Sequence, residues 1–195
     1  MVLASASGAR ARLLERACVP FVRDISAIDE GRIKADAWAQ GWRVEEAAAA
    51  LAEAKAMAVA ARHPGALVVG ADQILEFDGV WVDKATTLEE AADVLQRLRG
   101  RDHRLVSAAT VVHDGLVRWR TVDSARVTMR LFSASFLLHY LQELGPDVLE
   151  SVGCYRLEGL GVQLFAAIEG SFFTILGLPL LPLLEFLRTE GIVEP

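Results

Sequence analysis

The residues best suited to chemistry in this sequence are a few charged side chains that stand among apolar neighbours. Asp72 follows the apolar run 66–71, and it is the only acidic residue between Glu53 and Glu76. A carboxylate at the end of so apolar a strand needs a partner, which could be a cation, a metal ion or hydrogen bonds from nearby backbone N–H groups. The sequence alone leaves these possibilities open.

Lysine is scarce, with three residues (Lys34, Lys55 and Lys84) against 17 arginines. A compact ammonium charge suits phosphate groups, although the composition bias of a GC-rich genome would give the same ratio. Lys55 lies in the small and apolar stretch 54–59. We therefore expect its ammonium group to reach toward a partner.

The segment 5–10, Ser-Ala-Ser-Gly-Ala-Arg, follows the strand expected at 2–4 and opens a helical pattern that runs to Ala17. Hydroxyl and free N–H groups at a helix N-terminus bind anions. Arg10 in the first turn opposes the helix dipole, and a bound anion would reverse that cost. The alternative is a capped helix with a solvated Arg10.

Two further carboxylate motifs carry weaker signals. Asp29 and Glu30 lie in a polar loop after a strand expected at 21–24, and Glu158 lies in the Gly-bracketed turn 158–161. Taken alone, each pattern is typical of a solvated surface.

The elements that must position these residues alternate between strands and helices. Helices are expected at 44–62, from Thr86 or Thr87 to 99, at 133–144 and at 183–188, and strands at 66–71 and 162–168. Asp-Gly pairs at 78–79 and 114–115 predict hairpin turns. Alternation predicts that Ala125, Val127, Met129 and Leu131 share one face of a strand. The expected class is α/β or α+β with a mixed sheet.

Composition excludes several classes of protein. The 195 residues are 53% hydrophobic with a net charge of −6, which fits one domain with a sizeable core and argues against disorder and against general nucleic-acid binding. Two cysteines and four scattered histidines argue against a disulfide framework and against a zinc site. No signal peptide is visible and the apolar stretch 175–184 is too short to span a bilayer, so we expect a cytoplasmic protein without membrane contact.

Taken in order, the motifs resemble the Maf family of nucleoside triphosphate pyrophosphatases, over nearly the whole chain. The matching segments are 3–7 with Arg10, 28–30, 52–56, 69–73, 83–84, 98–103, 158–161, 168–170 and 177–180. The resemblance implies a single Maf-like domain over 1–195, with a Maf/ITPase-like elongated mixed sheet, flanking helices and two lobes around a central cleft. Homodimers are common in this family.

The activity that the resemblance implies is that of a hydrolase that clears modified nucleotides. It would cleave a nucleoside triphosphate between the α- and β-phosphates, releasing the monophosphate and pyrophosphate. The implied cofactor is a divalent metal, usually Mg²⁺, with Mn²⁺ or Co²⁺ as alternatives. The competing hypothesis is a nucleotide-binding regulator of septum formation and cell division that does not turn over its ligand, and a phosphatase that releases orthophosphate is a third.

The family's functional positions map onto eight residues of this chain. Asp72 matches the catalytic carboxylate near the metal, and Glu30 matches the second metal carboxylate. Because a carboxylate on a metal is a poor base, Asp72 is expected to orient the attacking water more than to take its proton. The remaining matches line the substrate: Ser7, Arg10, Lys55 and Lys84 for the phosphates, and Gln73 and Glu158 for the substrate's base.

Departures from the family pattern bear on the phosphates and on the base. The usual proline and first arginine of the N-terminal motif are Gly8 and Ala9 here, and Lys84 is followed by alanine rather than proline. Gln73 and Glu158 resemble the branch that prefers 7-methyl-GTP. A carboxylate can accept hydrogen bonds from guanine N–H groups, and methylation makes the base cationic. A tryptophan could stack on such a base, although core packing is its more common role: the candidates are Trp38, Trp42, Trp81 and Trp119.

Overall fold

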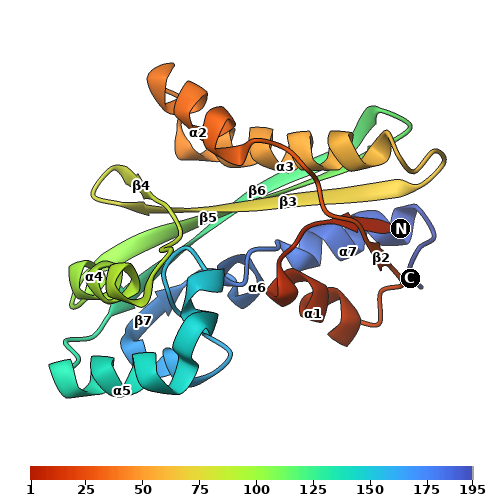
Figure 1. Cartoon of the computed structure of the whole chain (residues 1–195). Helices are drawn as coiled ribbons and strands as arrows, with labels where there is room; N and C mark the ends of the chain where they lie inside the picture. Colours follow the sequence, from red (N-terminus) through yellow and green to blue (C-terminus); the bar gives the residue numbers. More distant parts are fainter. Residues whose placement is uncertain (195) are drawn as a thin grey trace. The chain divides into compact units, whose positions relative to one another are not determined.

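A computed structural model, which describes residues 1–194, has a mixed α/β fold with a seven-stranded sheet (Figure 1). The strand order is β2-β1-β3-β5-β6-β7, and β4 pairs with β3 outside this path. The strands are β1 (Val2–Ala4), β2 (Val22–Arg23), β3 (Leu67–Phe77), β4 (Val80–Val82), β5 (Asp102–His113), β6 (Leu116–Met129) and β7 (Phe165–Glu169). The helices are α1 (Gly8–Arg16), α2 (Glu30–Ala39), α3 (Val44–Ala60), α4 (Leu88–Leu98), α5 (Ala134–Leu144), α6 (Phe172–Ile175) and α7 (Leu180–Thr189), with 3-10 helices at Gly145–Glu150 and Leu160–Leu164.

The described chain divides into two compact units, each built from separate stretches of sequence. The first unit contains residues 1–73, 106–123 and 171 onward, and the second contains 74–105 and 124–170. The long strands β3, β5 and β6 each contribute residues to both units. The expected mixed sheet is confirmed, since β1 pairs in parallel with β2 and β3 whereas β3/β4 and β6/β7 are antiparallel.

The first unit buries apolar side chains on both faces of its strands. Leu3 and Val69 join a cluster with residues of α1 and α7, whereas Val2 and Val68 join a second cluster with residues of α3. Figure 1 shows α3 on one side of β3 and α1 and α7 on the other. Successive strand residues point to opposite faces, so in the part of β3 that belongs to the first unit the even-numbered positions face α3 and the odd-numbered positions face α1 and α7.

Gly70 allows α3 to lie very close to β3. A Cβ atom at this position would lie 2.1 Å from the carbonyl oxygen of Ala52 and 2.7 Å from the backbone nitrogen of Ala56, both on α3. The close approach therefore requires glycine on the strand, and the small alanines of the helix favour it. It also brings the next residue on the same face of β3, Asp72, opposite the middle of α3.

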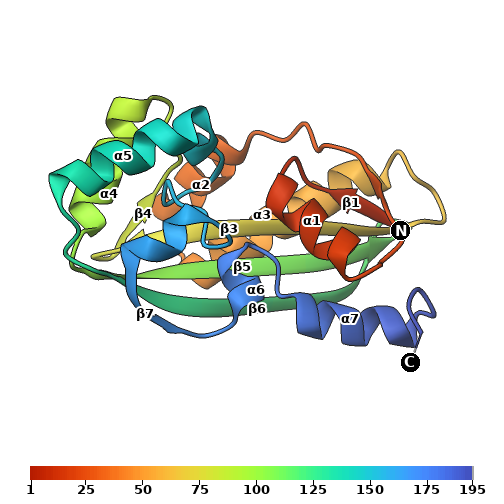
Figure 2. The same ribbon diagram turned by 90° about the horizontal axis from the view of Figure 1, so that it is seen from below.

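The second unit contains the β3–β4 hairpin, α4, α5 and β7. Asp78 and Gly79 both have positive φ angles, 52° and 72°, as a two-residue hairpin turn requires. Thr87 is the N-cap of α4, and the carboxylate of Glu90 accepts hydrogen bonds from the backbone and hydroxyl of Thr86, which confirms the expected helix start. Figure 2 shows α4 and α5 side by side.

The structure corrects four expectations about single elements. Strand β3 does not end before Asp72 but continues to Phe77, because the residues after Asp72 are again mostly apolar. Glu30 is not in a loop: Asp29 caps α2 by accepting from the backbone of Arg32, and Glu30 is the first helical residue. Strand β7 begins at Phe165, since residues 160–164 form a 3-10 helix. Leu131 is 73% exposed because β6 ends at Met129.

Candidate active site

Lys55, Asp72 and Glu30 meet at one point in the first unit. The Nζ atom of Lys55 lies 2.6 Å from Oδ1 of Asp72 and 2.9 Å from Oε2 of Glu30. The side chains of Lys55 and Asp72 are 8% and 7% exposed, whereas that of Glu30 is 50% exposed. The pair Lys55–Asp72 is therefore buried, and Glu30 approaches it from the solvent side.

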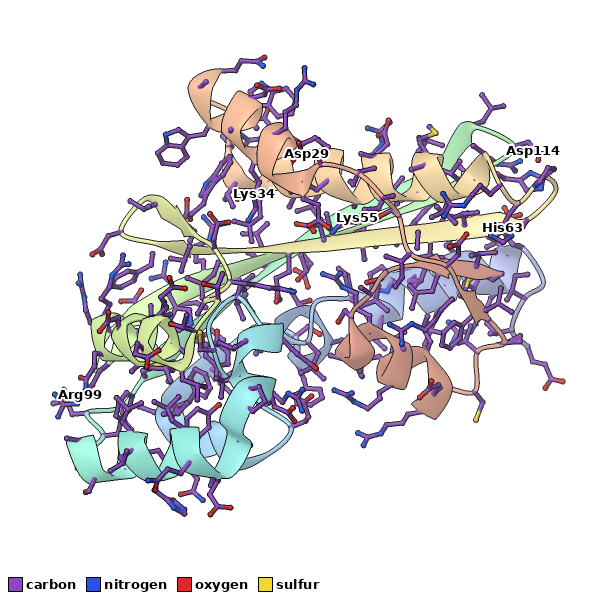
Figure 3. All side chains as sticks on the ribbon, viewed as in Figure 1. Asp29, Lys34, Lys55, His63, Arg99 and Asp114 are labelled. Atoms are coloured by element: carbon purple, nitrogen blue, oxygen red, sulfur yellow. The ribbon has the colours of Figure 1, made fainter. Side chains whose placement is uncertain are left out.

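Each of these residues is positioned by a regular element. Asp72 lies on the face of β3 that is covered by α3, and Lys55 lies on α3 between the small residues Ala52 and Ala56 that pack against Gly70. Glu30 opens α2, which contacts α3. In Figure 3, Lys55 lies between α3 and β3, and Asp29, the residue before Glu30, lies at the start of α2.

The structure identifies the partner that Asp72 needs. Of the alternatives left open by the sequence, a cation is found, because the ammonium group of Lys55 pairs with the buried carboxylate. The expectation that Lys55 reaches toward a partner is confirmed by the same contact. An ion pair of this kind is costly to break on one side only, since the remaining charge would be buried without compensation.

Arg10 is buried, and its guanidinium group makes hydrogen bonds within the protein. Nε donates to the carbonyl oxygen of Gly177 at 2.7 Å, and Nη1 donates to the carbonyl oxygen of Ala71 at 2.9 Å and to Oγ of Ser5 at 3.1 Å. Burial lowers the pKa of Arg10 below its usual value, while the charges of Asp72 and Glu30 act in the opposite direction. Arg10 is thus not the solvated side chain that the simplest alternative assumed.

Ser7 caps α1, because its hydroxyl accepts a hydrogen bond from the backbone nitrogen of Arg10. This is the helix N-terminus that the sequence indicated as an anion site. Its contact with phosphate stays a prediction, as does that of Arg10.

Gln73 is turned to the opposite face of β3 from Asp72. Its Nε2 atom lies 3.0 Å from Oγ of Ser107, 2.9 Å from the carbonyl oxygen of Thr174 and 3.0 Å from that of Ile175. Sequence reasoning did not select Ser107 or Thr174. The available signal was the position of Ser107, a polar residue inside the otherwise apolar stretch 105–109.

Lys84 and Glu158 belong to the second unit. Lys84 lines a pocket of about 300 Å³ together with residues of β4 and the exposed side of α4, among them Trp81, Asp93 and Arg97. Glu158 is exposed and immediately precedes Gly159 in the expected turn. Their roles in binding phosphate and base stay predictions.

The other tryptophans differ in their surroundings. Trp119 stacks on Phe186, with ring centroids 5.5 Å apart and an interplanar angle of 20°, so its ring is used in packing. Trp38 and Trp42, at α2 and just after it, are 52% and 39% exposed. Trp81 lines the same pocket of the second unit as Lys84.

The two carboxylates beside Lys55 are the candidate ligands for a divalent cation. Within residues 1–194, no cluster of three or more His, Cys, Asp or Glu side chains could hold a metal ion. The carboxylates of Glu30 and Asp72 nevertheless both contact the Nζ atom of Lys55. Each carboxylate makes this contact through one oxygen and has a second oxygen besides it. Mg²⁺ prefers oxygen ligands and is commonly held by one or two carboxylates together with waters and substrate phosphates. Glu30 and Asp72 are the residues that would hold it.

Among residues 1–194, no helix has both the length and the apolar character needed to cross a bilayer.

Comparison with known proteins places these residues in a family. The model of the family described as "Maf-like protein" matches residues 1–190. The chain is 50% identical over 194 residues to a "nucleoside triphosphate pyrophosphatase" of Paramagnetospirillum magneticum, covering 100% of both chains. It is 47% identical to a protein of the same description from Rhodospirillum rubrum, over 99% of this chain and 96% of that protein. It is 43% identical to a "7-methyl-GTP pyrophosphatase" of Rhizobium johnstonii, over 100% of this chain and 98% of that protein. This chain therefore belongs to the Maf-like protein family.

Proposed function

We propose that this protein is a nucleoside triphosphate pyrophosphatase, an enzyme that hydrolyses its substrate to the nucleoside monophosphate and pyrophosphate. The observation that carries the proposal is the buried Asp72–Lys55 pair with Glu30 beside it. Relatives that align over nearly the whole chain bear the names nucleoside triphosphate pyrophosphatase and 7-methyl-GTP pyrophosphatase.

In this proposal Asp72 orients the water that attacks the α-phosphorus. Attack on a phosphorus atom leaves little covalent chemistry to the protein, so rate enhancement comes from alignment and from neutralising charge on the phosphate oxygens. Lys55 supplies a fixed positive charge and holds the Asp72 carboxylate in one orientation. The strand β3 and helix α3 provide a rigid support for both.

The proposed cofactor is Mg²⁺, held by Glu30 and Asp72. When bound, it would neutralise charge on the substrate phosphates and on the departing pyrophosphate. Glu30 is half exposed and Asp72 is buried. Because Glu30 is accessible from solvent, substrate phosphates could supply further oxygen ligands to a cation held by these two carboxylates.

The proposed base is guanine carrying a 7-methyl group. Glu158 is an exposed carboxylate that could accept hydrogen bonds from the N–H groups of guanine, and its negative charge would favour a cationic base. The relative from Rhizobium johnstonii is named for this substrate.

We expect the protein to be a cytoplasmic homodimer, on the family resemblance. Light scattering after size-exclusion chromatography would measure its mass in solution.

The test is to detect phosphate with and without added inorganic pyrophosphatase. The protein is incubated with Mg²⁺ and a panel of standard and 7-methylated triphosphates. Phosphate that appears only with the helper enzyme supports the proposal. Phosphate without the helper would indicate a phosphatase, and no phosphate in either arm would favour the non-catalytic regulator.

The matched variants are Asp72→Asn and Asp36→Asn. The Asp72→Asn protein should fold but lose turnover, because an amide binds metal weakly and orients water differently. Asp36 is 64% exposed on α2, so its variant should retain activity. Full activity in Asp72→Asn would remove Asp72 from the mechanism.

A further inference from the structure

The side chain of Arg12 reaches back to the start of α1. Residues 8 and 12 are about one turn apart, so they share a face of the helix, and long side chains on a helix lean toward its N-terminus. A Cβ atom added at Gly8 would lie 3.0 Å from Nη1 of Arg12. Gly8, the first residue of α1, therefore leaves open the space in which this guanidinium group lies.

The start of α1 also presents backbone N–H groups that its cap does not use. The Oγ atom of Ser5 accepts from the backbone nitrogen of Ser7 at 3.2 Å, and the Oγ atom of Ser7 accepts from that of Arg10 at 3.4 Å. In the part of the chain that the structure describes, the N–H groups of Gly8 and Ala9 have no acceptor within the protein. Such groups bind anions, because they combine free donors with the positive end of the helix dipole.

A further arginine covers carbonyl oxygens of the same segment. Nη2 of Arg23, on β2, donates to the carbonyl oxygen of Ala6 at 2.6 Å and to that of Ser5 at 3.3 Å. No aspartate or glutamate precedes Glu15 in the sequence, and the first turn of α1 contains none. The segment 5–9 thus presents N–H groups beside positive charge, while two of its carbonyl oxygens are already bonded.

This segment is tied to the candidate active site through Arg10. Nη1 of Arg10 donates to the carbonyl oxygen of Ala71, the residue before Asp72. Burial lowers the pKa of Arg10, whereas the charges of Asp72 and Glu30 raise it, so these carboxylates lie close to its guanidinium group. Arg10 is buried and bonded to carbonyl oxygens, but Arg12 is only half-buried. Of the two side chains, Arg12 is therefore the more accessible to a ligand that enters from solvent.

We propose that Arg12 is a substrate-binding residue, whose guanidinium group contacts the phosphates of the triphosphate at the N-terminus of α1. This inference rests on the proposed function and adds to it a residue of the first unit. A bound phosphate would place negative charge beside a cation that the helix dipole disfavours, and it would give the N–H groups of Gly8 and Ala9 an acceptor. Arginine suits this contact because its planar set of N–H donors matches the oxygens of a phosphate.

The test measures binding apart from turnover, with inorganic tripolyphosphate as the probe. Its affinity in the presence of Mg²⁺ is measured by isothermal titration calorimetry, and kcat and KM are measured with the best nucleoside triphosphate. Arg12→Gln is compared with Arg16→Gln, which removes the same charge from the exposed last turn of α1. We expect Arg12→Gln to raise both the Kd of tripolyphosphate and KM by about 10-fold, with kcat changed by less than about threefold. Arg16→Gln should change none of these values.

Gly8→Ala tests the space that the glycine leaves open. The new Cβ atom would displace the guanidinium group of Arg12, so this substitution should weaken binding by about threefold in the wild type and have no effect in Arg12→Gln. Because alanine favours a helix more than glycine does, Gly8→Ala should not destabilise the free protein. An equal effect of Gly8→Ala in both backgrounds would contradict the contact between Arg12 and the phosphates.

Salt gives a second readout, and Arg12→Lys covers the case in which Arg12→Gln does not fold. The difference in affinity between wild type and Arg12→Gln should shrink as NaCl is raised from about 50 mM to about 500 mM, since salt screens contacts between charges. Arg12→Lys keeps the charge but loses the paired donors, so it should bind tripolyphosphate about threefold more weakly than the wild type.

The outcomes separate this inference from the proposed function. Unchanged affinity in Arg12→Gln, or an equal loss in Arg16→Gln, would overturn the proposal for Arg12. So would a loss of kcat with unchanged affinity for tripolyphosphate. A wild type that binds tripolyphosphate through Arg12 but hydrolyses no nucleoside triphosphate would support the contact and refute the proposed function.

Discussion

Replacing Lys55 by methionine tests the buried ion pair directly. The substitution keeps the length and apolar stem of the side chain but removes the ammonium group, which leaves the carboxylate of Asp72 buried without its closest cation. Breaking a buried pair on one side costs about 3–5 kcal/mol in general. The nearby guanidinium of Arg10 offsets part of this cost, and Glu30 loses little because it is half exposed. We therefore expect Lys55→Met to lower the free energy of unfolding by about 3 kcal/mol, close to the lower end of that range.

The double variant Lys55→Met/Asp72→Asn tests whether the unpaired carboxylate of Asp72 causes the loss of stability. Both partners are then uncharged, so the double variant should be more stable than Lys55→Met alone, with a loss of about 1–2 kcal/mol. The assay is equilibrium unfolding in urea, since typical domains have about 5–15 kcal/mol to lose and the variants should stay folded. A double variant less stable than Lys55→Met, or a Lys55→Met variant as stable as the wild type, would refute the reasoning.

The same variants test the proposed metal ligands. In Lys55→Met the two carboxylates of Glu30 and Asp72 face each other without the ammonium between them, so MgCl₂ should stabilise this variant against urea by mass action. The double variant lacks one of these carboxylates and should gain less. Equal stabilisation of both variants would place Mg²⁺ elsewhere.

Two further predictions concern the second unit. Burial lowers the pKa of His103 from 6.5 to about 4. Because the unfolded chain therefore binds this proton at a higher pH than the folded chain, the free energy of unfolding should fall by up to about 3 kcal/mol as the pH drops from about 6.5 to 4. Urea unfolding of His103→Gln should show a smaller fall over that range. The exposed carboxylate of Glu158 is expected to favour a guanine base, so Glu158→Gln should shift preference from guanine toward pyrimidine triphosphates; an unchanged ranking of kcat/KM across a nucleotide panel would refute this role.

The sequence predicted the charged partner of Asp72 only as one of several options. A carboxylate in an apolar run must be compensated, and that requirement is visible in the composition of its neighbours. The choice of Lys55 depends on the close packing of α3 on Gly70, a contact between segments far apart in the chain. Local patterns do not contain this information.

The presence or absence of a local pattern also explains which helices and turns could be predicted from the sequence. Helix α2 was not predicted, and its first residue, Glu30, was expected in a loop, because Ala37 is the only buried residue of this helix and the apolar periodicity that marks a helix is missing. Helices α3 and α4 and the two Asp-Gly hairpins were predicted, since their patterns and turn residues are local. For Arg10, the sequence offered a bound anion or solvent, whereas the observed partners include Gly177, at the other end of the chain.

The most direct measurement for the central claim is the position of bond cleavage in water enriched with ¹⁸O. The protein is incubated with Mg²⁺ and its best triphosphate in this water, and the products are analysed by mass spectrometry. Attack on the α-phosphorus predicts that the label appears in the nucleoside monophosphate and that pyrophosphate contains none. Label in pyrophosphate, or in released orthophosphate, would contradict the mechanism built on Asp72.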